Sequence, residues 1–243
     1  MTQTNSVAPA RPGPIRFGRR GEDGANLAGS SDVIAQASSD VGAATPSASP
    51  KLPHVAIAIP CGTMVHADFA VSLGSMMHSL GEMPMSIVVG KSSIVADARN
   101  LGLEYAQKYG AEYVLFIDSD MTFPKDALLK LLVRQVDIIG ATYSRRTAPF
   151  HFLGDILPEQ PADAPKGLLE MSRIPTGFLL IKATVFDKLR KPYFRFRVDE
   201  EAGVNIGEDF DFSDRVRAAG FRIWCDPYLS KELGHIGEQS FKL

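Results

Sequence analysis

Short apolar runs recur along the chain from Leu52 onward, and each is about as long as a buried strand. Val55 to Ile59 is a continuous apolar run stopped by Pro60, and residues 114–117 form another. Uninterrupted runs of this kind are typical of strands that are buried on both faces of a sheet. Comparable runs predict further strands at residues 86–89, 136–140, 177–181 and 222–225.

Between these runs the apolar positions take helical spacing. Residues 67–80 predict a first helix. Ser92 or Ser93 is suited to cap a second helix, and Gly110 is suited to end it. The apolar face of this second helix would consist of Ile94, Ala98, Leu101 and Tyr105.

Two later segments complete the pattern. Pro124 suits the first turn of a helix that continues through residues 128–132, and a last helix covers about residues 208–219 before Gly220. Strands that alternate with helices predict an α/β fold, in which a mostly parallel sheet is flanked by helices.

The first part of the chain has a different texture. Residues 1 to about 52 are rich in Ala, Ser, Gly and Pro and nearly free of large hydrophobic side chains. Such a segment buries too little apolar surface to offset the entropy of ordering. We therefore expect a disordered tail or linker at residues 1–52 and a folded domain at residues 53–243.

Composition narrows the functional classes. The 243 residues carry a net charge of −2, so no global basic field favours nucleic acid as a partner. Cys61 and Cys225 are the two cysteines, with no Cys-x-x-Cys pair, so we expect neither a zinc site nor a disulfide framework. No apolar run reaches the length of a transmembrane segment, and the N-terminus lacks the order of a secretory signal. A cytoplasmic protein is expected.

The strand at residues 114–117 runs into Asp118-Ser119-Asp120. Because side chains alternate along a strand, we expect Asp118 and Asp120 at its end to point to the same side, with Ser119 turned away from them. Two negatively charged carboxylates at such a short distance repel each other unless a cation lies between them. Carboxylate oxygens are suitable ligands for Mg²⁺ or Mn²⁺. The carboxyl end of a strand is also where open α/β sheets bind ligands. We therefore interpret this motif as a candidate metal site.

Three other stretches carry candidate chemistry. Glu208 and Asp209 lie at the start of a predicted helix, where an acid held at a cleft could act as a general base. Glycines flank His235, whose neutral imidazole could bind a metal. Arg99, followed by Asn100, offers a planar fork for diphosphate or ribose oxygens.

The order of these motifs resembles the GT-A class of glycosyltransferases, most closely the family-2-like members of bacteria and phages. The resemblance covers about residues 53–243. It rests on five motifs in register: Arg99-Asn100, Asp118-Ser119-Asp120, Thr176-Gly177-Phe178, Gly207-Glu208-Asp209 and Gly234-His235.

The resemblance implies a GT-A (Rossmann-like) fold, a nucleotide-sugar donor of the UDP or GDP type, and a glycan or other hydroxyl acceptor. It implies that Mn²⁺ or Mg²⁺ is bound by Asp120 and His235, with Asp118 at the ribose or at the waters of the metal. Asp209 would be the base of an inverting enzyme, and Glu208 would bind the acceptor. The nucleotide would lie beside Pro60, Cys61 and the Arg99-Asn100 pair, with residues 143–146 near donor or acceptor.

Some alternatives stay open in the sequence. Asp211 flanks the same helix start as Asp209, so the base is not unique and a retaining mechanism is possible. Ile117 to Thr122 also fits the first motif of a haloacid-dehalogenase-type phosphatase, in which Asp118 would be the nucleophile and Asp120 the acid/base. A nucleotidyltransferase is a further alternative. The sugar, the nucleotide base, the acceptor and the oligomeric state are not recorded in these motifs.

Overall fold

The fold is built on one mixed sheet. The computed structural model describes residues 51–146 and 152–237, and its largest sheet has the strand order β2-β1-β3-β8-β5-β11-β7-β6. β8 and β7 run antiparallel to the other strands, so the sheet is mostly parallel, as predicted. The strands are β1 (Val55–Cys61), β2 (Met85–Lys91), β3 (Tyr113–Ile117), β5 (Ile138–Gly140), β6 (Asp155–Ile156), β7 (Leu169–Arg173), β8 (Phe178–Lys182) and β11 (Ile223–Cys225).

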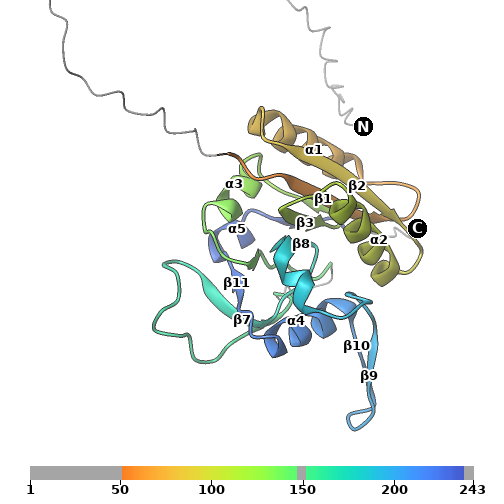
Figure 1. Cartoon of the computed structure of the whole chain (residues 1–243), viewed down its shortest axis with the longest axis vertical. Helices are drawn as coiled ribbons and strands as arrows, with labels where there is room; N and C mark the ends of the chain where they lie inside the picture. Colours follow the sequence, from red (N-terminus) through yellow and green to blue (C-terminus); the bar gives the residue numbers. More distant parts are fainter. Residues whose placement is uncertain (1–50, 147–151, 238–243) are drawn as a thin grey trace, which may run out of the picture. The chain divides into compact units, whose positions relative to one another are not determined.

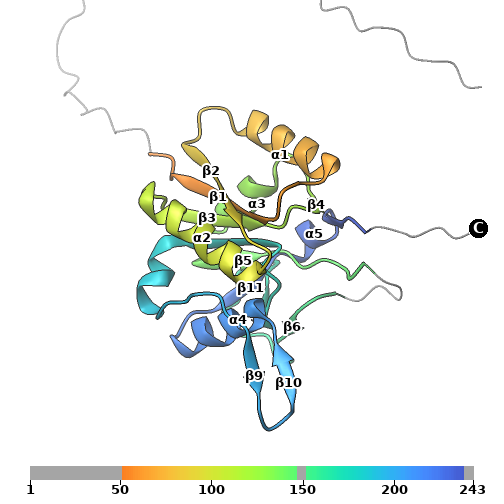
Figure 2. The same cartoon turned by 90° about the vertical axis from the view of Figure 1, so that its right-hand side faces the viewer.

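Helices cover both faces of this sheet (Figures 1 and 2). One face packs against α1 (Ala67–Leu80), α3 (Ala127–Leu132) and the short α5 (Pro227–Ser230). The other face packs against α2 (Val95–Lys108), the 3-10 helix η1 (Ala183–Lys188) and α4 (Glu208–Ala218). The α/β architecture predicted from the alternation of strands and helices is therefore confirmed.

The inner strands explain why the run Val55 to Ile59 is apolar throughout. Ile57 contributes to the core on the α1 face, whereas Ala56 and Ala58 contribute to the core on the α2 face. The small side chains on the second face let α2 approach closely. Gly102 of α2 illustrates this, because a Cβ built on it would lie 3.5 Å from the Cβ of Ala58. This close packing determines how far the polar side chains of α2 reach into the sheet.

Two small sheets complete the fold. β4 (Met121–Thr122) pairs antiparallel with β12 (Gly234–His235), and β9 (Arg197–Asp199) pairs antiparallel with β10 (Val204–Ile206). The β9–β10 hairpin projects from the rest of the domain directly before α4, as Figure 2 shows. Neither sheet was predicted, because two- and three-residue strands carry no recognisable period.

Most predicted elements are confirmed, including the helix at residues 67–80 and the helix that ends before Gly220. The second helix differs from its prediction. It begins at Val95, and the hydroxyl of Ser92 instead accepts a hydrogen bond from Ile94 N, at 3.0 Å, in the preceding turn.

The predicted apolar face of this second helix is also wrong, apart from Ala98. Ile94 is 50% exposed and Tyr105 is exposed as well. The helix is rotated because a charged side chain, Arg99, occupies its buried face together with Ala96 and Leu103. Apolar spacing alone cannot predict such a rotation, since it assumes that charged positions face the solvent.

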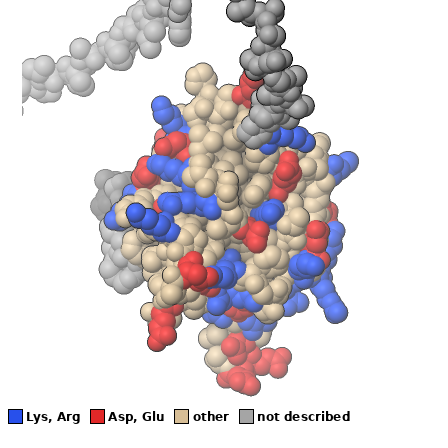
Figure 3. All heavy atoms as spheres, turned by 60° about the vertical axis from the view of Figure 1, so that its left-hand side comes forward, with Lys and Arg blue, Asp and Glu red and all other residues tan. Residues whose placement is uncertain are grey.

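The predicted tail at residues 1–52 lies outside the described residues except for its last two positions, so its disorder stays a prediction. Within the described part of the chain, the helices are too short or too polar to cross a membrane. On the face drawn in Figure 3, acidic and basic side chains are interspersed, in keeping with the small net charge.

Candidate active site

The candidate site begins where β3 ends. β3 stops at Ile117, and Asp118 to Met121 form a turn in which Met121 N donates to the carbonyl oxygen of Asp118 at 3.2 Å. The prediction that both aspartates continue the strand is therefore wrong. The two aspartates, separated by Ser119, both lie at the edge of the sheet, and each carboxylate contacts a different set of partners.

Asp118 belongs to a buried line of charges. Arg99 of α2 donates to Asp118 Oδ1 at 2.8 Å through one arm of its guanidinium, and its other arm is ion-paired with Glu208 of α4. The Arg99 side chain is 4% exposed. Both arms of the fork are thus occupied by the protein itself. Arg99 connects α2, β3 and α4, rather than presenting its fork to a ligand as the sequence suggested.

Asp120 belongs to a second, more open group. β12 brings His235 opposite Met121, and Ile236 N donates to the carbonyl oxygen of Asp120 at 2.9 Å. His235 Nε2 lies 3.7 Å from Asp120 Oδ2. A Cβ at Gly234 would meet Thr122 Oγ1, so a side chain there would force the Thr122 hydroxyl to move. The structure therefore brings together two of the predicted metal ligands, which are 115 positions apart in the sequence.

The ring of His235 is oriented by its surroundings. Its Nδ1 lies 3.0 Å from the carbonyl oxygen of Ser144, which can only accept, so Nδ1 carries the proton. Nε2 is then the unprotonated nitrogen, and it accepts from Arg146 Nε at 3.0 Å. Burial lowers the pKa of His235 below the ordinary histidine value, which favours this neutral form. The lone pair of Nε2 thus points to Arg146, with Asp120 Oδ2 at 3.7 Å from the same nitrogen, and the neutral imidazole is the form of histidine that binds metals.

Tyr143 lies between the two groups. Its ring makes an edge-on contact with His235, with centroids 4.9 Å apart, and its hydroxyl accepts from Gly177 N at 3.0 Å. A Cβ on Gly177 would collide with this hydroxyl and would lie 2.8 Å from Asp118 Oδ2. Gly177 is therefore required for close approach, which explains the glycine in the Thr176-Gly177-Phe178 motif. Burial, more than the nearby Asp118 charge, raises the pKa of Tyr143, so it stays neutral.

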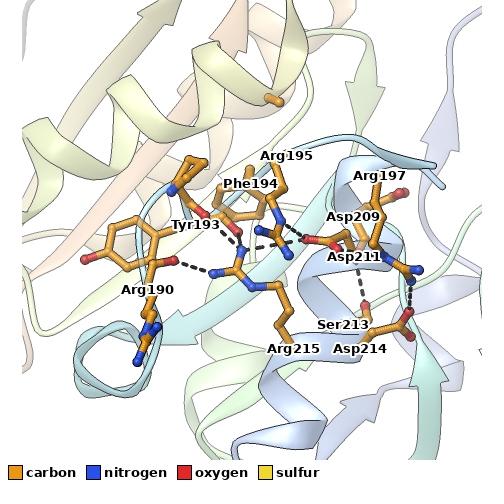
Figure 4. Close-up of polar contacts among 12 residues, drawn as sticks. Arg190, Tyr193, Phe194, Arg195, Arg197, Asp209, Asp211, Ser213, Asp214 and Arg215 are labelled. Carbon is orange, nitrogen blue, oxygen red and sulfur yellow. Dashed lines mark hydrogen bonds and ion pairs between the residues drawn. The ribbon is translucent and has the colours of Figure 1, made fainter. Parts of the chain in front are cut away.

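The acids on α4 have different environments. Asp211 is 1% exposed and is ion-paired with Arg195 Nε at 3.0 Å and Arg197 Nε at 3.1 Å, as Figure 4 shows. Arg215 Nη1 lies 3.7 Å from the same carboxylate. These three arginines surround Asp211 and occupy both of its carboxylate oxygens. It is thus poorly placed to take a proton from a ligand.

Asp209 is half-buried and has no arginine bonded to it among the described residues. One of its oxygens accepts from Phe210 N at 2.8 Å. Burial raises the pKa of Asp209, although the charge of Arg99 and the backbone N–H groups at the helix start act in the opposite direction. Asp209 is therefore the less engaged of the two carboxylates.

Other predicted contact residues are placed differently. The Asn100 amide donates to the carbonyl oxygens of Ala96 and Phe194 and accepts from the N–H groups of Tyr193 and Phe194. Its donors and acceptor sites are thereby satisfied, which leaves none for a nucleotide. Pro60 is buried in β1, while Cys61 is half-buried at the end of that strand.

The side chains of the second group fit a divalent cation. In residues 51–146 and 152–237, no three His, Cys, Asp or Glu side chains are grouped closely enough to hold a metal by themselves. However, Asp120 Oδ1 is buried with no hydrogen-bond partner in the described part of the chain. Mg²⁺ and Mn²⁺ commonly take one or two protein ligands and complete their shell with waters and substrate phosphates. Asp120 and His235 supply such a pair.

The sequence placed Tyr143 and Arg146 only within a stretch, residues 143–146, expected near donor or acceptor, and predicted no separate role for either residue. The available signal was their position just after the predicted strand at residues 136–140, at the same edge of the sheet as Asp118. The ion pairs of Asp211 with Arg195 and Arg197 could not be predicted from the sequence. The two arginines precede α4, and no local sequence pattern pairs them with an acid on that helix.

No protein-family model and no curated protein matches this chain. Solved structures do. A197 from STIV has a TM-score of 0.50 at 14% identity, over 79% of this chain and 98% of A197. GalNAc-T7, crystallised with UDP, GalNAc and Mn²⁺, has a TM-score of 0.49 at 11% identity, over 78% of this chain but only 45% of that protein. At such identities the likeness to A197 concerns the fold alone, and the likeness to GalNAc-T7 adds nothing to it.

Proposed function

We propose that this protein is a metal-dependent glycosyltransferase that moves a sugar from a nucleotide-sugar donor to a hydroxyl acceptor with inversion. One observation carries the proposal: the unprotonated Nε2 of His235 faces Asp120 Oδ2 at 3.7 Å, beside the buried and unpartnered Asp120 Oδ1. The motif order that resembles GT-A glycosyltransferases supports the same reading of these residues.

In this proposal Asp120 and His235 hold the cation. The bound cation would neutralise the diphosphate oxygens as negative charge develops on the leaving group. The protein orients these two ligands through Ser144 and through the backbone bond from Ile236 to Asp120. Asp118, fixed by Arg99 through one oxygen, keeps its other oxygen for a ribose hydroxyl or a metal-bound water.

Asp209 is the proposed base. As the acceptor oxygen bonds to the anomeric carbon, the bond from that carbon to the diphosphate breaks, and the acceptor proton passes to the Asp209 carboxylate. Its raised pKa makes it a stronger base than an ordinary aspartate. Glu208 is ion-paired with Arg99, so we assign it to positioning Arg99 rather than to binding the acceptor.

No contact among the described residues favours the phosphatase alternative. It requires Asp118 to act as a nucleophile, yet Asp118 Oδ1 accepts a charge-assisted bond from the buried Arg99. Such a bond stabilises the carboxylate and reduces its nucleophilicity. The nucleotidyltransferase alternative uses the same metal ligands and differs in the bond that breaks, so only product analysis separates it from the proposal.

The donor test is a thermal-shift screen of the full chain with UDP- and GDP-sugars, with and without Mn²⁺. A ligand that binds the native state raises the melting temperature with its concentration. We expect a shift that requires both the nucleotide sugar and Mn²⁺, that disappears in Asp120→Ala, and that persists in Asp126→Ala, which removes a half-exposed acid from the N-cap position of α3. A shift that persists in excess chelator would contradict metal dependence, and release of phosphate from a simple phosphomonoester would favour the phosphatase.

The base is tested by comparing Asp209→Asn with Asp211→Asn. We expect Asp209→Asn to lower turnover by about 10²–10⁴-fold with donor affinity little changed, since general-base catalysis contributes about that much. Asp211→Asn should reduce stability more than turnover, because it leaves its arginine partners without a counter-charge. Normal turnover in both variants would exclude a base on α4.

A further inference from the structure

Arg146 occupies the atoms that the proposed metal would use. Its guanidinium is ion-paired with Asp120 Oδ2, and its Nε donates to His235 Nε2 at 3.0 Å. Arg146 follows β5 on the segment that also contributes Tyr143 and Ser144 to the site. A positive charge thus already occupies Asp120 Oδ2 and the imidazole lone pair.

The guanidinium and a divalent cation cannot share these two atoms. The lone pair on the unprotonated nitrogen of His235 serves either an N–H donor or a metal, and the two positive charges repel each other at such a distance. Binding of the cation therefore requires Arg146 to withdraw from Asp120 and His235.

The surroundings of Arg146 allow that withdrawal. Its side chain is 49% exposed, so the guanidinium is solvated by water once it leaves the carboxylate. On the side of Arg146 the ion pair is open to water, which weakens the attraction and compensates the guanidinium for the loss of its partner. No second carboxylate is paired with Arg146 among the described residues, in contrast to Arg99, which has two and is nearly fully buried.

We propose that Arg146 is an internal cation that closes the metal site and competes with the divalent ion for Asp120 and His235. The inference rests on the proposed function only in its choice of metal ligands. It predicts that the affinity for the metal is set by two terms, the attraction of the ligands and the cost of displacing Arg146. Removing Arg146 therefore strengthens metal binding, whereas removal of a typical site residue would weaken it.

The test is direct measurement of Mn²⁺ affinity, by isothermal calorimetry or by the spectrum of free Mn²⁺, on the full chain without any nucleotide. We compare the unchanged protein with Arg146→Ala and with Arg145→Ala. Arg145 is the exposed neighbour and carries the same charge. Its replacement therefore measures how far the loss of any one positive charge near the site changes Mn²⁺ affinity. A double variant, Asp120→Ala with Arg146→Ala, shows whether the ion binds at this site.

We expect Arg146→Ala to bind Mn²⁺ several-fold and up to about tenfold more tightly, as loss of a weak ion-pair competitor predicts. Arg145→Ala should change affinity much less, and the double variant should lose the gain. Unchanged or weaker binding in Arg146→Ala, an equal gain in both single variants, or no Mn²⁺ binding in any variant overturns the proposal. Tighter binding without sugar transfer would support the competition while contradicting the proposed function, so the two failures are distinguishable.

Discussion

Two groups of charges meet at the carboxyl end of β3, and each has an arginine between two side chains of the site. In the first, Arg99 connects Asp118 to Glu208, and its side chain is 4% exposed. In the second, Arg146 connects Asp120 to His235, and its side chain is 49% exposed. The same residue type thus serves as a fixed part of the scaffold in one group and as a replaceable partner in the other.

The difference follows from the elements that carry the two arginines. Arg99 lies on a regular helix, α2, that packs closely against the sheet. The approach is so close that a Cβ at Gly90 of β2 would collide with the backbone of Ala98. Arg146 lies on a loop after a three-residue strand. A charge that is held in place on a packed helix cannot leave without unfolding part of the core, whereas a charge on a loop exchanges its partner for water.

The largest expected contrast is in stability. Arg99→Ala removes the cation from two carboxylates at a buried position, and breaking a buried pair in this way typically costs about 3–5 kcal/mol of unfolding free energy. Arg146→Ala should stay within about 1 kcal/mol of the unchanged protein. Urea denaturation of both variants measures the two values. Equal losses would mean that Arg146 is also structural, and the distinction between the groups would fail.

A smaller effect is expected for the close packing behind the first group. Gly177→Ala places a methyl group against the hydroxyl of Tyr143 and against Asp118, and overpacking of this kind typically costs about 1–3 kcal/mol. Gly62→Ala is the matched control, since a Cβ there has no neighbour within 4 Å. Denaturant midpoints of the two variants should differ clearly. If Gly177→Ala is as stable as Gly62→Ala, the first group is less rigid than its contacts indicate.

The third prediction concerns pH and the proposed base, which lies one residue after Glu208. Burial raises the folded-state pKa of Asp209 above its value in the unfolded chain. The stability from this group is therefore fully present below the ordinary aspartate pKa of about 3.9, and it is lost as the pH rises through the folded-state pKa.

Asp209→Asn replaces the acid by a neutral group of the same shape, so it does not lose stability in this pH range. We expect the variant to be more stable than the unchanged protein at neutral pH and equally stable near pH 4, in denaturant titrations at a series of pH values. A variant that is less stable at neutral pH would show instead that the ionised Asp209 carboxylate stabilises the fold by capping α4, and does not lower the unfolding free energy.

The smallest effect is expected for the segment before the domain. β1 begins at Val55, whose N–H donates to the carbonyl oxygen of Pro84 at 3.0 Å, and both arginine groups lie between residues 99 and 235. Removing residues 1–50 should change the unfolding free energy by no more than about 0.5 kcal/mol. A larger loss, measured by the same denaturation, would place part of that segment in the folded core.

The sequence determined the local elements of this protein. Continuous apolar runs predicted β1 and β3, helical spacing predicted the helix at residues 67–80, and Gly110 and Gly220 mark helix ends where the backbone takes positive φ angles of 68° and 91°. These signals are reliable because the burial of a strand or of a helix face depends on neighbours in the sequence. β7 was missed, since its second residue, Glu170, is buried and carries a charge that Arg217 and Arg222 neutralise.

Tertiary structure decided which of the candidate site residues contact one another. The sequence indicated Arg99, Asp118, Asp120, Glu208, Asp209 and His235 as site residues, but not that Arg99 bonds two of them or that Arg146 reaches two others. Those pairings join positions up to 109 residues apart, from Arg99 to Glu208, and they exist because β3, α2, α4 and β12 meet at one edge of the sheet. Spacing along a chain records which face a residue takes, whereas the partner of a charge depends on which elements the topology places beside it.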